Sequence, residues 1–181
     1  MNSWDKYFLE ICNVVANNSK CLSRKIGAIL VKDKRILCTG YNGAPSGVPH
    51  CNHRYLLDKA LIKEMKEKGI EHDPDLANVC PRRALGYKSG EGLHLCIAGH
   101  AERNCLITAA RVGIATEGCS LYLNVGIPCK DCLIEIINAG IKEVVVTDLS
   151  YYDAESEYLV EQSNLKIREY AEDERTERYN A

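Results

Sequence analysis

Apolar positions along this chain follow two different periods, which predict an alternation of helices and strands. Residues 4–16 place apolar side chains every three or four positions, as one buried helix face requires. Residues 26–31 are almost continuously apolar, and residues 35–41 form a second such run after a short polar turn. We therefore expect a helix followed by a hairpin of two strands.

The second half of the chain alternates helical and strand patterns. The expected helices are residues 101–112, 130–138 and 154–161, and the expected strands are residues 120–125, 143–147 and 165–170. Strands that are separated by helices usually run parallel, whereas the first two strands form an antiparallel hairpin. The pattern therefore predicts an α/β fold with a mixed sheet.

The segment in the middle of the chain has a different character. Residues 54–68 are predicted to form an exposed helix with charges on every side, which Gly69 ends. We interpret residues 53–92 as an insertion in a single domain that spans residues 1–181. Because the insertion contains few apolar residues, another interaction is needed to stabilise its fold. A charged tail is expected from about residue 172.

Composition limits the classes of function. A formal charge of −2 and a pI near 6.2 argue against a nucleic-acid-binding protein, which needs clustered Lys and Arg. We expect no signal peptide and no membrane span, because no apolar run is long enough. Ten cysteines, some at short spacings with histidines nearby, point to metal ligands before disulfides, and we expect a cytoplasmic protein.

The main chemical motif joins the starts of two predicted helices. It consists of His100 and Glu102, followed by Pro128, Cys129 and Cys132. This H-x-E and P-C-x-x-C arrangement is the known signature of zinc-dependent nucleobase deaminases. His100, Cys129 and Cys132 supply three soft zinc ligands and leave the fourth position for water. A structural zinc site is the alternative, which a bare C-x-x-C motif would equally allow.

Glu102 is expected to act as the catalytic base. Two positions along a helix from His100, its carboxylate is not a natural fourth metal ligand. We expect Glu102 to take a proton from the attacking water, pass it to the substrate ring and protonate the departing ammonia.

Further stretches resemble the deoxycytidylate (dCMP) deaminases over about residues 3–153. The resemblance rests on five motifs, which are KIGAILV from Lys25, GYNGAPSG from Gly40 running to His50-Cys51, HAERN from His100, PCKDC from Pro128 and INAGIK from Ile137. The GYNGxPxG motif separates this family from the tRNA adenosine deaminases and the free-cytidine deaminases. The resemblance implies a cytidine deaminase-like three-layer α-β-α sandwich with a mixed five-stranded sheet.

The resemblance also implies an activity and its regulation. The family hydrolyses dCMP to dUMP and ammonia, is activated by dCTP and inhibited by dTTP, and usually forms a hexamer. By position, Asn42 is expected to contact the substrate sugar. Tyr151, or Tyr152, is expected to stack on the base, and Arg24 or Lys25 to face the 5′-phosphate.

Effector binding is expected at other matching positions. By resemblance these are Tyr41 and Gly43 in the glycine-rich loop, where Mg²⁺ would accompany a nucleoside triphosphate, and Arg111. The chain departs from the family at Arg103 and Cys105, where hydrophobic and small residues are usual.

A second, structural zinc is expected near the insertion. Its candidate ligands are Cys51, Cys80, His94 and Cys96, with Cys21 as a competitor for one position. The resemblance supports this expectation, because some family members have such a zinc, which would also hold the weakly apolar segment. The remaining cysteines fall on apolar positions and are expected in the core; they are Cys12, Cys38, Cys105 and Cys119.

Three other functions share parts of these motifs. A tRNA adenosine deaminase would need a basic face, which the acidic balance of the chain disfavours. A riboflavin-pathway deaminase is usually fused to a reductase, for which this chain is too short. A non-catalytic zinc-binding accessory protein of the competence type stays open, and release of ammonia from dCMP would separate it from an enzyme.

Overall fold

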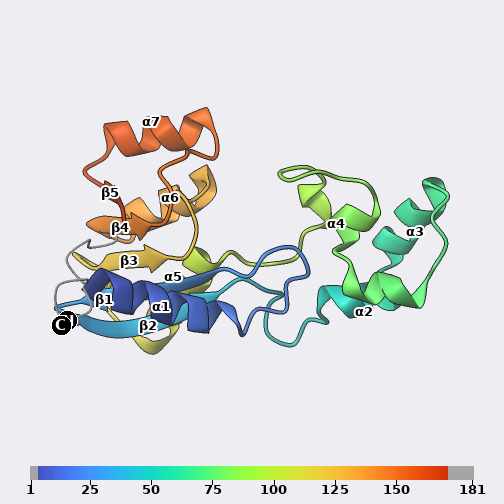
Figure 1. Cartoon of the computed structure of the whole chain (residues 1–181), viewed down its shortest axis with the longest axis horizontal. Coiled ribbons are helices and arrows are strands. Elements are labelled where there is room, and N and C mark those ends of the chain that lie inside the picture. Colours follow the sequence, from blue (N-terminus) through green and yellow to red (C-terminus); the bar gives the residue numbers. More distant parts are fainter. Residues whose placement is uncertain (1–3, 171–181) are drawn as a thin grey trace, which may run out of the picture. The chain divides into compact units, whose positions relative to one another are not determined.

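The computed structural model describes residues 4–170, which fall into two compact units described here one at a time. The first unit contains the described residues up to Asn18, Ile26–Tyr41 and the described residues from His100 onward. The second unit contains Ser19–Lys25 and Asn42–Gly99. Figure 1 labels the elements of both units.

A mixed five-stranded sheet forms the centre of the first unit, as the sequence predicts. Its strands are β1 (Gly27–Lys32), β2 (Arg35–Tyr41), β3 (Ser120–Leu123), β4 (Glu143–Val146) and β5 (Lys166–Glu169). They are ordered β2-β1-β3-β4-β5. Strand β1 runs antiparallel to β2 and β3, whereas β3, β4 and β5 are parallel to one another.

The hairpin between β1 and β2 turns at Asp33 and Lys34. Both residues have positive φ angles, 50° and 61°, which is the backbone of the two-residue turn that matches the twist of a hairpin. The predicted polar turn is therefore confirmed, and it fixes the register in which Lys32 pairs with Arg35.

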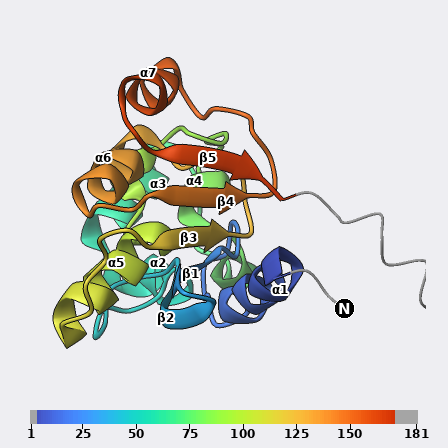
Figure 2. The same cartoon turned by 90° about the vertical axis from the view of Figure 1, so that its left-hand side faces the viewer.

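Helices cover both faces of the sheet, so the first unit is a three-layer sandwich (Figure 2). The helices are α1 (Trp4–Ala16), α5 (Ala101–Val112), α6 (Lys130–Asn138) and α7 (Ala154–Gln162). Ile29 and Val31 pack with the buried face of α1. Ala28 and Leu30, which point to the other face of the sheet, pack with α5 and α6. The four cysteines expected in the core, Cys12, Cys38, Cys105 and Cys119, are buried.

Two glycines let these helices lie directly on the strands. A Cβ atom on Gly40 of β2 would lie 2.4 Å from the backbone nitrogen of Cys105 in α5. A Cβ atom on Gly27 of β1 would clash in the same way with the backbone of α1 at Cys12. Because α5 begins beside the predicted metal ligand His100, the contact at Gly40 helps to position that ligand.

The second unit is helical, and here the sequence prediction needs correction. Its helices are α2 (Cys51–Leu57), α3 (Lys59–Glu67) and α4 (Pro81–Ala84), with 3-10 turns η1 (Pro74–Asn78) and η2 (Leu93–Leu95). The single helix expected over residues 54–68 is wrong, because Asp58 interrupts it. The Asp58 side chain accepts hydrogen bonds from the backbone nitrogens of Ala60 and Leu61, at 3.0 and 3.2 Å, and so begins a new helix.

The second unit has a hydrophobic core of its own. The core consists of Tyr55, Leu61, Met65, Leu85 and Leu95. Leu61 and Met65 bury one face of α3, so the expected helix with charges on every side is also wrong. The segment therefore has a source of stability that its composition did not indicate.

Two expectations concern the limits of the chain. The charged tail expected from residue 172 lies outside the described residues. Among residues 4–170, no helix is both long and apolar enough to cross a membrane.

Candidate metal and catalytic site

The starts of α5 and α6 bring the three predicted metal ligands together. His100 is the residue immediately before α5, and Cys129 is the residue immediately before α6; both have extended backbones. Cys132 lies in the first turn of α6. Because helix starts expose N–H groups and carry partial positive charge, they favour thiolates at these positions.

The ligand atoms have the spacing that a tetrahedral metal requires. The Nδ1 atom of His100 lies 3.3 Å from Sγ of Cys132 and 3.6 Å from Sγ of Cys129. Zinc bonds of about 2.0–2.3 Å at tetrahedral angles separate ligand atoms by about 3.5 Å. Within residues 4–170, these three residues form the group of three or more possible ligand atoms that lie within 4.8 Å of one another.

The protonation of these ligands is coupled. A hydrogen bond from Cys132 lowers the pKa of Cys129 to about 4, and the same contact raises the pKa of the Cys132 thiol. A hydrogen bond with Cys129 also raises the pKa of His100. Without metal, His100 and Cys132 are therefore the ligands that hold protons more tightly, and a metal ion must displace these protons when it binds.

Glu102 is buried beside these ligands in the first turn of α5. Only 5% of the residue is exposed, and burial raises the pKa of its carboxyl group. Its Oε2 atom is buried without a hydrogen-bond partner among the described residues. A buried carboxylate oxygen in this state is costly unless it receives a proton or a water. The donor set and this oxygen together fit a catalytic zinc with its water.

An ion pair that the sequence did not reveal lies next to the ligands. Arg103 of α5 donates from Nε and Nη2 to one carboxylate oxygen of Glu135 in α6, at 2.8 and 2.5 Å. The unusual Arg103 after the H-A-E motif was the available signal. Its partner could not be found, because the pairing depends on how two helices pack.

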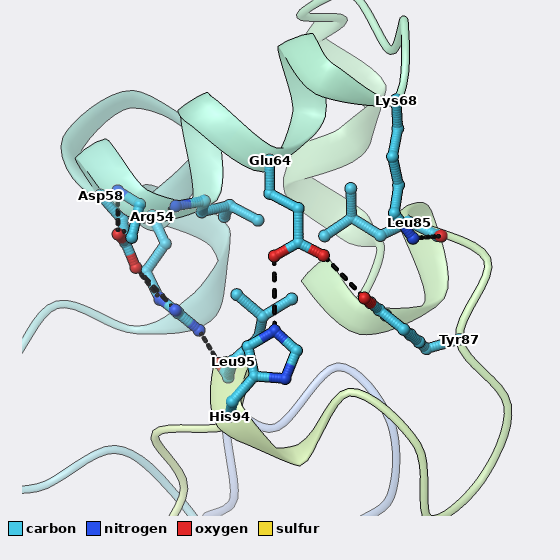
Figure 3. Close-up of polar contacts among 10 residues, drawn as sticks. Arg54, Asp58, Glu64, Lys68, Leu85, Tyr87, His94 and Leu95 are labelled. Atoms are coloured by element: carbon cyan, nitrogen blue, oxygen red, sulfur yellow. Dashed lines mark hydrogen bonds and ion pairs between the residues drawn. The ribbon is translucent and has the colours of Figure 1, made fainter.

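The residues expected at the second zinc are only partly brought together, all within the second unit. Cys51 lies close enough to Cys80 and Cys21 for their charges to affect its ionisation. Figure 3 shows His94 turned instead to Glu64, with 3.4 Å between Nε2 and Oε2.

Cys96, the fourth expected ligand, also lies outside any group of possible metal ligands among the described residues. Cys96 is exposed. Within residues 4–170, no group of three or more ligand atoms within 4.8 Å of one another includes the candidates for the second zinc. The structure therefore places Cys51 within electrostatic reach of Cys21 and of Cys80, whereas His94 is paired with Glu64.

The residues expected to bind nucleotides lie in different settings. In the second unit, Asn42 is buried, and its Nδ2 atom donates to the Arg24 carbonyl at 2.9 Å. Gly43 pairs with Gly99 through two backbone hydrogen bonds, and Arg24 is exposed. In the first unit, the exposed residues are Tyr41, Arg111, Tyr151 and Tyr152.

Comparison with known proteins agrees with the motifs. The family model described as "Cytidine and deoxycytidylate deaminase zinc-binding region" matches residues 2–148. A deoxycytidylate deaminase from Schizosaccharomyces pombe is 32% identical over 168 residues, which cover 93% of this chain and 44% of the relative. The ComE operon protein 2 of Bacillus subtilis is 27% identical over 172 residues, covering 95% of this chain and 74% of that protein.

A solved structure extends the comparison to the fold. The dCMP deaminase of cyanophage S-TIM5, in complex with dCMP and dUMP, matches with a TM-score of 0.61 at 23% identity. The match covers 91% of this chain and 95% of that one. The chain spans about half the length of the yeast relatives, 44% and 45%. From its motifs, its fold and the match over residues 2–148, the chain belongs to the cytidine and deoxycytidylate deaminase family.

Proposed function

We propose that this protein is a zinc-dependent hydrolase that converts dCMP to dUMP and ammonia. The proposal rests chiefly on the buried carboxylate of Glu102, with its unpaired oxygen, beside three soft ligand atoms. A structural zinc site has no use for a buried, unpaired carboxylate next to the metal. The deoxycytidylate deaminase names of relatives at 28–35% identity support dCMP as the substrate.

The chain supplies the metal ligands and the base for this reaction. His100, Cys129 and Cys132 would hold zinc, which when bound lowers the pKa of a water molecule. The three ligands together neutralise the charge of the metal if both cysteines are thiolates, so the acidifying effect is moderate. A neighbouring base is then useful, and Glu102 is the buried group that can act as one.

Glu102 would move the protons of the reaction. It removes a proton from the attacking water and transfers it to the ring nitrogen next to the amine-bearing carbon of cytosine. The water oxygen forms a bond to that carbon, and Glu102 then carries the second proton to the amine. The carbon–nitrogen bond breaks, ammonia leaves and the carbonyl of dUMP remains. The raised pKa of Glu102 suits both acceptance and donation of a proton.

Substrate and effector contacts follow the same family pattern as proposals. Asn42 would contact the sugar, Tyr151 the base and Arg24 the 5′-phosphate. The exposed side chains of Tyr151 and Arg24 are consistent with ligand contacts, whereas the amide of Asn42 is already bonded to backbone in the free chain. A role in substrate binding would therefore require a rearrangement of these contacts.

Regulation is proposed at the remaining positions. dCTP would activate the enzyme and dTTP would inhibit it by binding at Tyr41, Gly43 and Arg111. Mg²⁺ would accompany the triphosphate.

The exposed apolar residues Ile107 and Val112 on α5 support association into a homo-oligomer, for which we propose a hexamer. We place the enzyme in the cytoplasm, where relatives with this activity would meet free nucleotides.

A second, structural zinc is proposed in the second unit. The electrostatic effect of both Cys21 and Cys80 on Cys51 supports it, and the candidate ligands would have to move closer together to complete the site. Two zinc ions per chain in fully loaded protein are expected. A count of one, unchanged when Cys80 is replaced by Ser, would remove this second site.

A non-catalytic role is the competing function, because the ComE operon protein 2 is similar over 95% of this chain. The zinc-loaded protein should be assayed for ammonia release from dCMP, dCTP, deoxycytidine and tRNA. Release from dCMP well above the other three is expected. Full zinc occupancy without release from any of them would favour the accessory role, and release from tRNA would identify a different deaminase.

A further inference from the structure

An ion pair joins the two helices that supply the metal ligands. Arg103 lies one residue after Glu102 in α5, and Glu135 lies one turn after Cys132 in α6. Two nitrogens of the guanidinium, Nε and Nη2, donate to Oε1 of Glu135 at 2.8 and 2.5 Å. Two hydrogen bonds that converge on one oxygen restrict the direction of the guanidinium as well as its distance, which a single hydrogen bond does not.

Two roles for Arg103 have to be separated. Its positive charge acts electrostatically on three groups of the site. These are His100, Glu102 and Cys132. A field role would require a net positive charge at the ligands, but the carboxylate of Glu135 contacts the guanidinium directly and offsets its field. A mechanical role needs only the link between the helices.

We propose that Arg103 and Glu135 form a positioning pair that holds the starts of α5 and α6 at the spacing of the metal ligands. In this proposal the pair acts through His100 and Cys132, whose ligand atoms lie 3.3 Å apart, and not by contact with metal or substrate. A site whose ligands are already in place loses less conformational freedom when the metal binds.

The exposure of the pair limits the size of its effect. Both side chains are 39% exposed, so solvent screens the ion pair and its contribution to overall folding is small. Neighbouring groups that orient metal ligands affect metal affinity by about 10- to 100-fold. Because this pair is half-exposed and acts indirectly, we expect a smaller loss of zinc affinity, about three- to tenfold.

Zinc competition with a chromophoric chelator tests the proposal directly and needs no nucleotide. The variants are Arg103→Met, Glu135→Gln, their double mutant and the exchanged pair Arg103→Glu with Glu135→Arg. Each single change should weaken zinc binding about three- to tenfold. The double mutant should lose no more affinity than the single variant with the larger loss, and the exchanged pair should restore most of the affinity. Lys63→Met with Glu67→Gln removes a pair within one helix, α3, and should leave affinity unchanged.

Opposite results separate the two roles. If Arg103 acted through its charge alone, Arg103→Lys would bind zinc as tightly as wild type, and that result would overturn the positioning role. Unchanged affinity in both single variants would overturn it as well. Thermal unfolding of the metal-free variants reports whether they fold. Should the exchanged pair not fold, Arg103→Lys, which keeps the charge but loses the fork, is expected to weaken zinc binding and must not bind as wild type.

The activity readout rests on the proposed function and is kept separate. With dCMP, both single variants should lower kcat while KM stays within about twofold, because the pair does not contact substrate. The zinc affinities could change as expected although the protein releases no ammonia. That result would support the positioning role and contradict only the proposed deaminase function. Normal kcat together with normal zinc affinity in both single variants would overturn the proposed positioning role.

Discussion

His100 and Cys132 are 32 residues apart in the chain, yet the Nδ1 atom of one lies 3.3 Å from the Sγ atom of the other. The contact is formed because α5 and α6 begin at the same place on one face of the sheet and pack in one core. A ligand site assembled from two helix starts depends on each of its members, so removal of a single ligand should release the metal.

Replacement of Cys132 by Ser should remove one zinc ion per chain. A hydroxyl is a poor zinc ligand at neutral pH, and the remaining two donors cannot hold the ion tightly. Metal analysis of purified protein measures the loss. Cys12→Ala is the matched control, because Cys12 is equally buried but packs on the other face of the sheet. Equal zinc content in the Cys132 variant and wild type would place the metal elsewhere.

Zinc affinity should rise with pH. The pKa values of His100 and Cys132 are raised in the metal-free chain by hydrogen bonds with Cys129, so protons compete with zinc near neutral pH. Each displaced proton changes affinity by about tenfold per pH unit. In chelator competition, zinc affinity should therefore rise at least about tenfold per pH unit over part of the range between about pH 6 and pH 8, which corresponds to one displaced proton. An affinity that does not change over this range would contradict the protonation described here.

Glu102→Gln should stabilise the metal-free protein near neutral pH. Burial raises the folded-state pKa of Glu102, so its stabilising contribution is complete below the unfolded pKa, about 4.3, and is lost as pH rises through the folded value. Glutamine does not undergo this loss, and we expect a gain of about 1 to 3 kcal/mol at neutral pH that disappears near pH 4.

Urea unfolding of the metal-free proteins at both pH values measures this gain. Glu64→Gln is a control of opposite sign, because the hydrogen bond from Tyr87 lowers the pKa of Glu64. That variant should lose stability at neutral pH. A Glu102→Gln protein that is less stable than wild type at neutral pH would mean that the carboxylate has a structural partner.

Gly40→Ala should destabilise the first unit and loosen the metal site. The new methyl group would lie 2.4 Å from backbone atoms of α5, so the helix must move away from β2. Overpacking of this kind costs about 1 to 3 kcal/mol, and more where backbone must shift. Thermal unfolding and zinc competition measure the two effects. Gly43→Ala is the control, because a methyl group at Gly43 would have no other atom within 4 Å, and this variant should unfold like wild type. Equal stability of the two variants would show that α5 can move away from β2 without cost.

Local signals were sufficient to predict most elements of the first unit and the three residues that gather at its candidate metal site. The helix over residues 101–112 was predicted to the residue because Gly113 ends it in a left-handed conformation, with φ of 73°. The H-x-E and P-C-x-x-C spacing identified ligands whose atoms are brought together by two helix starts. These features depend on short stretches of sequence and on one recurrent motif.

The features that sequence could not provide depend on tertiary packing. Asp58 was read as one more charge on a long helix, although its side chain ends one helix and begins the next. Arg103 and Glu135 face each other only because α5 and α6 pack together. His94, expected as a zinc ligand, is paired with Glu64, 30 residues earlier in the chain.

Turnover of dCMP by zinc-loaded wild-type protein and by Glu102→Gln, at equal zinc content, tests the central role of this site most directly. Dual measurement of dUMP and ammonia follows both products. We predict that wild type forms them in equal amounts and that Glu102→Gln keeps its zinc but loses about 10²- to 10⁴-fold in kcat. Normal turnover by Glu102→Gln, or no turnover by fully zinc-loaded wild type, would contradict the account.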